Sequence, residues 1–175
     1  QTVTVQSTEA GTVYLVSDSV TVTNLSSLTN AADNLVNSVA VAANAGTTLA
    51  LTGLAEGTYH AYAVDASGNV SAISGSSVIV DNTAPVFTSA ATAADITDST
   101  TVGDTVYTAA ATDAHGVTYS LNDTGHFSIN ASTGVVTLLS SPAKATGAQF
   151  TVTATDAAGN QTTHTVTYNV VDTTP

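Results

Sequence analysis

The stretch FTVTATDAAGNQTTHTVTYNVVDTTP, residues 150–175, sets out the folding pattern of this chain. Apolar and hydroxyl side chains alternate on both sides of DAAGN, and alternation with β-branched residues is typical of a half-buried β-strand. In the run 164–171, Val166, Tyr168 and Val170 fall on one face, and threonine and asparagine fall on the other. We therefore predict two strands, separated by a loop, with one packed face and one wet face.

A close relative of this stretch, AVDASGNVSAISGSSVIVDNTAP, closes the first half of the chain at residues 63–85. A fixed period indicates tandem modules, and about 90 residues is an ordinary size for a domain. We predict a first module at 1–81, a linker at 82–85, and a second module at 86–175 that ends in the next linker. The residues shared at a spacing of 91 positions are Asp65 and Asp156, Gly68 and Gly159, Asn69 and Asn160, and Asp81 and Asp172.

Short alternating runs continue through the whole chain, with turn residues between them. Many short strands with regular turn signals favour a β-sandwich, so we predict an all-β chain of two tandem Greek-key sandwiches. The remaining runs are 2–6, 12–16, 20–24, 58–64, 76–80, 105–112, 117–122 and 135–139.

Residues 24–39, NLSSLTNAADNLVNSV, are the exception to the alternation. Leu25, Leu28, Ala32 and Leu35 recur at helical spacing, and either Asn24 or Ser26 is a suitable N-cap. We predict a short helix across one end or edge of the first sandwich.

The charge balance restricts the partners of the chain. It carries 13 acidic residues and one basic residue, Lys144, for a net charge of -12. A chain without arginine neither neutralises phosphates nor docks on an anionic membrane, so nucleic acid and membrane surfaces are excluded as partners. Cations are the natural ligands. Turn formation and solubility explain any single aspartate equally well, and both interpretations stay open.

Catalytic and redox motifs are missing from the sequence. There is no cysteine, no nucleophile elbow and no phosphate-binding glycine loop. The four histidines show no paired metal-ligand spacing, and we interpret them as solvated strand or loop residues. Without tryptophan, a sugar-cleaving cleft would lack stacking platforms. We predict that the chain is not an enzyme, and no apolar run reaches the roughly 20 residues of a membrane span.

The order of the motifs resembles that of known repeat families. Residues 96–175, with VGDTVYTAAATD, YSL, FSINASTGVVT, ATD and VVDTTP, look like a cadherin repeat. Residues 11–85, with GTVYLV, GLAEGTYHAYAVDASGN and VDNTAP, are similar to the Ig-like repeats of very long bacterial surface adhesins, many of them exported by type I secretion (RTX type). The resemblance implies an extracellular, cell-surface location and adjacent repeats of the same chain as partners.

The resemblance also implies calcium at the junctions between modules. In such arrays the ion is held by an acid near the first strand of one module, an acid in the linker, and acids in two loops of the next module. Asp65 would face a preceding module, whereas Asp98 and Asp172 would serve the following junction. The family's second loop acid is His115 here, and Lys144 lies in the place of another acidic motif, so we expect one ion rather than three. The junction ligands implied in this chain are Glu9, Asp81, Asn82, Asp113 and Asp156.

These expectations favour a calcium-stiffened spacer of an extracellular bacterial adhesin that is monomeric in solution and holds an adhesive tip away from the cell, as in a biofilm. A ligand-binding adhesin module for a glycan, a protein or a second copy is the alternative, because loops at sandwich ends are common binding sites. An accessory domain of a secreted polysaccharide-active enzyme also fits the composition. We expect the sequence to be a segment of a longer tandem array.

Overall fold

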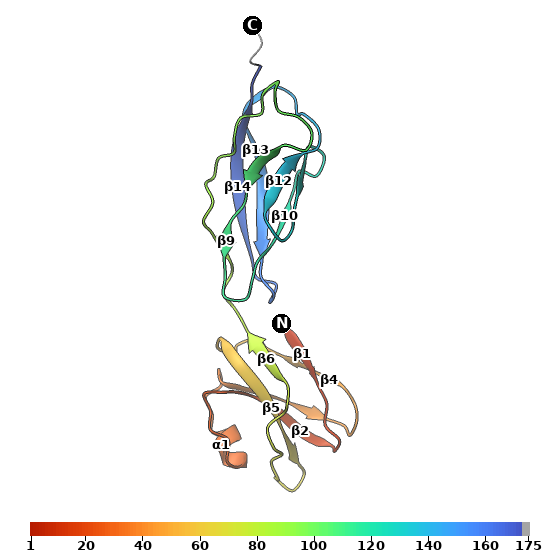
Figure 1. The fold of residues 1–175 in the computed structure, drawn as a ribbon. Helices are drawn as coiled ribbons and strands as arrows, with labels where there is room; N and C mark the ends of the chain where they lie inside the picture. The colour runs from red at the N-terminus through yellow and green to blue at the C-terminus, as the bar shows by residue number, and fades with distance from the viewer. Residues whose placement is uncertain (173–175) are drawn as a thin grey trace. The chain divides into compact units, whose positions relative to one another are not determined.

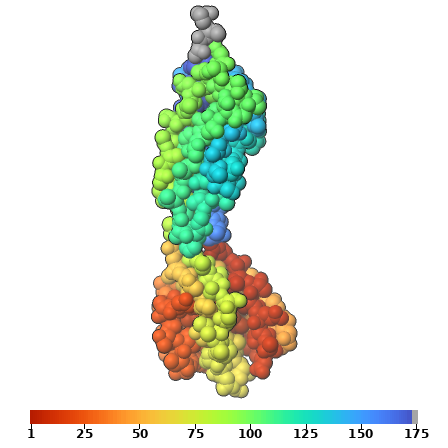
Figure 2. All heavy atoms as spheres, in the orientation of Figure 1, coloured from red at the N-terminus to blue at the C-terminus, as the bar shows by residue number. Residues whose placement is uncertain are grey.

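The computed structural model describes residues 1–172, and the chain divides into two compact units, Gln1–Asn82 and Thr83–Pro175 (Figure 1). Both units are all-β, and each folds as a β-sandwich, as the alternation predicts. No helix among these residues has both the length and the apolar character that crossing a membrane requires. Figure 2 shows the same chain with all heavy atoms as spheres.

Unit 1 packs a four-stranded sheet against a two-stranded sheet. The order of the large sheet is β3-β2-β5-β6, and the small sheet pairs β1 with β4. Inward residues of both sheets, among them Val5, Leu15 and Tyr59, form one buried cluster. The strands are β1 Thr2–Val5, β2 Gly11–Ser17, β3 Val36–Val41, β4 Thr47–Ala50, β5 Gly57–Asp65 and β6 Ser77–Val80.

A short helix, α1 (Leu25–Thr29), covers the outer face of the large sheet. Leu28 is fully buried and packs in a second cluster with Val16 and Val64, which point away from the main core. Asn24 caps the helix: its Oδ1 accepts from the N–H of Ser27, and the Ser27 hydroxyl oxygen accepts from the N–H of Asn24. The sheet is therefore dry on both faces beneath α1.

Two sequence predictions in this region are wrong. The short helix forms, but it packs on the outer face of the large sheet instead of crossing an end or edge of the sandwich, and residues 36–41 pair along β2 as β3. Residues 20–24 form no strand; Val20 and Val22 pack against the second cluster, and the segment leads into the capping residue Asn24. Long-range packing decides both outcomes, and local propensity is only a weak guide against it.

Unit 2 also packs two sheets, ordered β10-β13-β14 and β11-β12-β8, and adds the short pair β7-β9. Residues 91–96 run parallel to β14, with bridges from Thr92 to Thr167 and from Ile96 to Val170. The strands are β7 Val86–Phe87, β8 Thr105–Thr108, β9 Ala111–Thr112, β10 Thr118–Leu121, β11 Phe127–Ile129, β12 Val135–Leu138, β13 Ala145–Thr155 and β14 Gln161–Val170.

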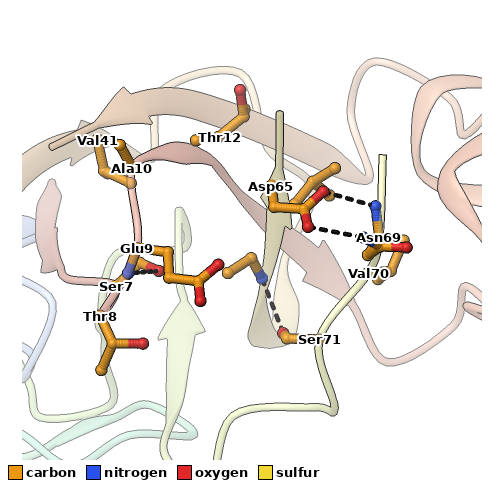
Figure 3. A pocket seen from close by; sticks show the side chains of 13 residues that line it. Ser7, Thr8, Glu9, Ala10, Thr12, Val41, Asp65, Asn69, Val70 and Ser71 are labelled. Carbon is orange, nitrogen blue, oxygen red and sulfur yellow. Dashed lines mark hydrogen bonds between the residues drawn. The ribbon is translucent and has the colours of Figure 1, made fainter. Parts of the chain in front are cut away.

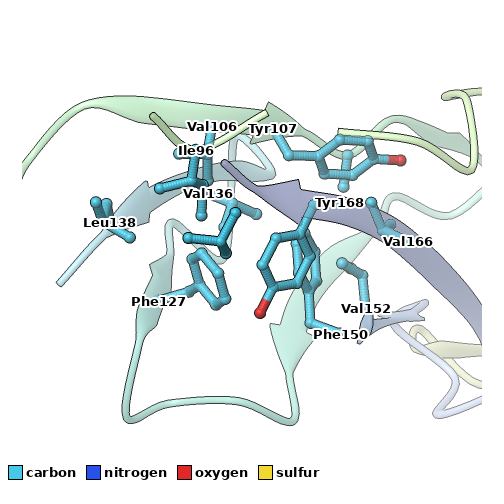
Figure 4. Close-up of a cluster of buried hydrophobic side chains, with 12 residues drawn as sticks. Ile96, Val106, Tyr107, Phe127, Val136, Leu138, Phe150, Val152, Val166 and Tyr168 are labelled. Carbon is cyan, nitrogen blue, oxygen red and sulfur yellow. The ribbon is translucent and has the colours of Figure 1, made fainter. Parts of the chain in front are cut away.

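Aromatic rings fill the centre of unit 2. Phe127, Phe150 and Tyr168 lie with ring centroids 5.1–5.8 Å apart, and Tyr107 packs edge-on to Phe150 (Figure 4). Tilted and edge-to-face contacts at these separations are the favoured arrangements of aromatic pairs. Phe150 and Tyr168 come from the two strands that the opening stretch of sequence predicts.

The β13–β14 pair shows the predicted alternation. Val166, Tyr168 and Val170 are buried, and the threonine pairs Thr151–Thr165 and Thr153–Thr163 occupy the other face. His164 departs from the interpretation of the histidines as solvated. It lies on the face of the buried residues, its ring stacks on Phe87 at 4.7 Å, and its Nε2 is buried.

Candidate metal centres

The repeated aspartates close two loops of the same design. In unit 1, Asp65 Oδ1 accepts from the N–H groups of Ser67 and Asn69 at 2.8 and 2.9 Å. Its Oδ2 accepts from the Asn69 side-chain amide at 2.6 Å. An ionised carboxylate has about four lone-pair positions, so capacity remains for a cation. The aspartate thus acts as a turn former and stays available as a ligand.

In unit 2, Asp156 and Asn160 repeat this arrangement. The N–H of Asn160 donates to Asp156 Oδ1 at 2.9 Å, and its side-chain amide donates to Oδ2 at 2.8 Å. The same amide donates to the carbonyl oxygen of Thr83 at 3.2 Å. The loop therefore lies at the end of unit 2 where the chain enters it.

Both loop aspartates are held in the ionised form. Hydrogen bonds, chiefly from the side chain of Asn69, lower the pKa of Asp65 below its ordinary value. Burial raises the pKa of Asp156, but the hydrogen bonds from Asn160 and from the loop backbone outweigh burial and lower the pKa. Deprotonated carboxylates are the form that binds cations.

Glu9 and Asp65 lie at one end of unit 1. Both line a cavity of about 260 Å³, together with Ser7, Asn69 and Ser71 (Figure 3). The pairing of Gly11 with Asp65 brings the segment after β1 to the tip of β5. This end carries two carboxylates and several hydroxyl groups.

The predicted grouping of Glu9 with Asp81 is not present in unit 1. Asp81 follows Val80, which pairs with Gly57 at the beginning of β5, whereas Glu9 lies beside Asp65 at its end. β5 has nine residues, which at roughly 3.3 Å each separate the two ends by about 26 Å. The direction of β1 causes this difference, because it carries the chain away from Asp81.

A different glutamate lies near Asp81. Glu56 precedes β5 directly, and its Oε1 accepts from the N–H of Asn82 at 3.3 Å. The side-chain nitrogen of Asn82 donates to the carbonyl of Leu54 at 3.1 Å, so Oδ1 is the atom of that amide that suits a cation. The β5–β6 pairing alone creates this neighbourhood, and no motif in the sequence signals it.

In unit 2, Asp113 lies at the same end as Asp156. Asp113 follows Thr112, the β9 residue that pairs with Val86, and leads to Thr118, which pairs with Thr155. Its Oδ1 accepts from the N–H of His115 at 2.8 Å. The structure thus brings Asp113 and Asp156 to the entry end of unit 2, as the sequence prediction requires.

Asp98 and Asp172 lie at the other end of unit 2. Asp98 follows Ile96, which bridges to Val170, and Asp172 is two residues beyond Val170. Lys144 Nζ lies 4.0 Å from Asp172 Oδ2, with both side chains more than half exposed. The ten residues of β14 separate this end from the entry end by about 30 Å.

The oxygen donors at these ends fit a hard cation. Calcium takes six to eight oxygen ligands from carboxylates, amide and backbone carbonyls, and water, and each end supplies the first two kinds. The described residues offer no thiolate, which disfavours softer metals.

Comparison with known proteins gives structural neighbours only. No protein-family profile matches the chain, and no curated protein sequence matches it. Drosophila N-cadherin EC1-3 matches over 94% of this chain and 56% of its own length, at 18% identity and a TM-score of 0.47. Mouse cadherin-23 EC22-24 matches over 76% of this chain and 49% of its own, at 23% identity and a TM-score of 0.46.

Human protocadherin-24 EC1-2 matches over 52% of this chain and 46% of its own length, at 23% identity and a TM-score of 0.46. This chain therefore spans about half the length of these three structures. The neighbours are cadherin extracellular domains, and the likeness is one of fold at low sequence identity. Conclusions about ligands rest on this chain's own residues.

Proposed function

We propose that the chain is a calcium-stiffened spacer segment of an extracellular bacterial adhesin. The supporting observation is the position of the acidic ligand candidates at the ends of the units. Glu9 and Asp65 lie at one end of unit 1, and Glu56 and Asp81 lie at the other. Cation binding at the ends of a module would affect how the module attaches to its neighbours, and it would leave the core of the module unchanged.

The junction ligands that we propose come from the segments on either side of the Asn82–Thr83 peptide bond. Converging carboxylates repel one another without a cation, and a divalent ion converts this repulsion into attraction. Glu56 takes the place of Glu9 in the set that the sequence predicts. The proposed set is Glu56, Asp81, Asn82, Asp113 and Asp156.

The outer ends would serve adjacent repeats of the same chain. Glu9 and Asp65 would contribute to a junction before unit 1, and Asp98 and Asp172 to one after unit 2. Asp172 lies near Lys144. We therefore expect the junction after unit 2 to bind calcium more weakly than the junction between the two units.

Small-angle scattering and thermal melting, with calcium and then with chelator, test this proposal. Calcium at a hundredfold excess over its dissociation constant would stabilise the ordered pair by roughly 2.7 kcal/mol per site, and the scattering profile would indicate a narrower range of conformations. The double variant Asp81→Asn, Asp113→Asn should lose both responses. A control with the same charge change, Asp95→Asn, Asp104→Asn, alters exposed acids near the end of unit 2 that lies away from Asp113 and Asp156, and it should keep them. Equal calcium responses in the two variants would refute the junction site.

A ligand-binding role for unit 1 is the second candidate, and the cavity between Glu9 and Asp65 favours it. Its acidic lining suits a cationic or hydroxyl-rich ligand. Screening of glycans and amines against the chain and its Glu9→Gln variant, in chelator, separates this role from calcium binding. Binding that is lost in Glu9→Gln would support the second candidate.

A further inference from the structure

Unit 1 has an open seam between its two sheets. β6 is the last strand of the large sheet, and β1 pairs with β4 alone among residues 1–172. A cavity of about 290 Å³ lies between them, with Leu15, Tyr59, Ala61 and Val78 among its lining residues. The two strands that border the seam contain no proline and no charged residue, which are common devices that protect strand edges.

In unit 2, residues 86–96 close the equivalent seam. This segment precedes β8 in the chain. Its first part pairs with β9, and its second part runs parallel to β14. Ile96 is 1% exposed and belongs to the core. Four backbone hydrogen bonds of 2.9 Å join this segment to β14 and to Val171, which follows it. The N–H groups of Ala93, Thr167, Ile96 and Val171 donate to the carbonyl oxygens of Thr167, Ala91, Asn169 and Ile96, respectively.

Strand pairing shows that the two seams correspond. When the sequence of unit 1 is shifted by 91 residues, β5 aligns with β13 and β6 aligns with β14. In unit 1, β1 pairs with β4, the strand that comes before β5. In unit 2, β8 pairs with β12, the strand that comes before β13. β1 is therefore the counterpart of β8. Residues 83–104, which lead into β8, have no counterpart ahead of β1 within residues 1–175.

The chemistry of the seam defines its occupant. None of the residues that line the cavity is charged, and its inner wall is apolar. A second copy of this chain would bring a further net charge of -12 to the contact. Peptide groups of an added strand would pair with an open edge, and its alternate side chains would enter the cavity.

We propose that the seam of unit 1 binds an extended β-strand of about ten residues that leads into β1 in the parent polypeptide. The strand runs parallel to β6, as residues 91–96 run parallel to β14, and places a β-branched apolar side chain in the cavity as Ile96 does in unit 2. The seam is an intramolecular docking site for this strand.

The strand of unit 2 is the probe for this proposal. A copy of residues 85–104 joined directly ahead of Gln1 should occupy the seam. We expect the β6 amides, Ser77–Val80, to become at least tenfold slower in hydrogen exchange and the melting midpoint of unit 1 to rise by roughly 5–10 °C. A matched graft with aspartate at the copied Ile96 and proline at the copied Ala93 should give neither effect.

Two results would overturn the proposal. One is equal exchange of the β6 amides in the ungrafted, grafted and matched-control chains. The other is concentration-dependent dimerisation of the ungrafted chain in sedimentation, with β6 protected in the dimer, which would assign the seam to a second copy. Protection by the intact graft in a monomer supports the proposal.

Discussion

Asp123 and His126 close a turn between β10 and β11. The His126 Nδ1 lies 3.0 Å from Asp123 Oδ2, and the His126 N–H donates to Oδ1 at 3.1 Å. Burial raises the pKa of Asp123, but the hydrogen bonds and the charge of His126 outweigh burial and lower it. A carboxyl group whose pKa is lower in the folded state stabilises the fold at pH values above its unfolded pKa.

We therefore expect unit 2 to lose this stabilisation as the pH falls from about 4 through the folded-state pKa of Asp123. Asp123→Asn removes this part of the acid sensitivity, because the amide does not ionise. Urea unfolding between pH 6 and pH 2.5, in chelator, measures the effect. Asp33→Asn should keep the wild-type profile, and a variant Asp123→Asn with the same profile would contradict the prediction.

Tyr59 ties the beginning of β5 to the loop before it. The ring is fully buried, and the hydroxyl lies 2.9 Å from the carbonyl oxygen of Ala55 and 3.1 Å from that of Asn34. Tyr59→Phe should destabilise unit 1 by about 1–2 kcal/mol, because the buried hydroxyl proton that these two carbonyls share is lost. Tyr62→Phe on the outer face is the matched control, with an expected change below about 0.5 kcal/mol. Urea unfolding of the two variants measures the difference.

Gly134 and Gly147 both adopt left-handed backbone angles, with φ of 70° and 69°. A Cβ at Gly134 would collide with the carbonyl oxygen of Ala109, whereas a Cβ at Gly147 meets nothing within 4 Å. Gly147→Ala should cost about 1 kcal/mol for the backbone conformation alone. Gly134→Ala should cost about 3 kcal/mol, because the collision adds to that strain. If the two variants lose similar amounts of unfolding free energy in chemical denaturation, the backbone at Ala109 moves aside to make room for the new Cβ.

Leu28 attaches the helix to the large sheet of unit 1. Its side chain is 0% exposed and packs against Val16 and Val64. Leu28→Ala should destabilise unit 1 by about 2–4 kcal/mol through lost burial and the cavity left behind. Asn24→Ala, which removes only the cap, should cost about 1 kcal/mol. If the two variants unfold at the same denaturant concentration, α1 adds no packing energy to the fold.

Sequence alternation identifies the strands that are long enough to show a two-residue period of apolar and polar side chains. β13 and β14 alternate valine and threonine over many residues, and the structure places them as the alternation predicts. β3 is missed because VNSVAV follows a leucine pattern with helical spacing, and only its pairing with β2 decides the matter. Residues 127–129 are too short a run to carry a period.

The acidic ends were partly visible in the sequence. The period of 91 finds the loops of Asp65 and Asp156, because each loop is made from five consecutive residues. The place of Glu9 depends on the direction of β1, and the place of Glu56 depends on the pairing of β5 with β6. Neither relationship is local, so spacing along the chain does not reveal it.

The parallel pairing of residues 91–96 with β14 determines how unit 2 would respond to a pulling force. The chain enters through the segment that precedes this pair and leaves from the far end of β14. Tension on the two ends therefore acts along the strands and loads their backbone hydrogen bonds together, in shear, rather than one after another. The unit would therefore yield only when several of these bonds break at once.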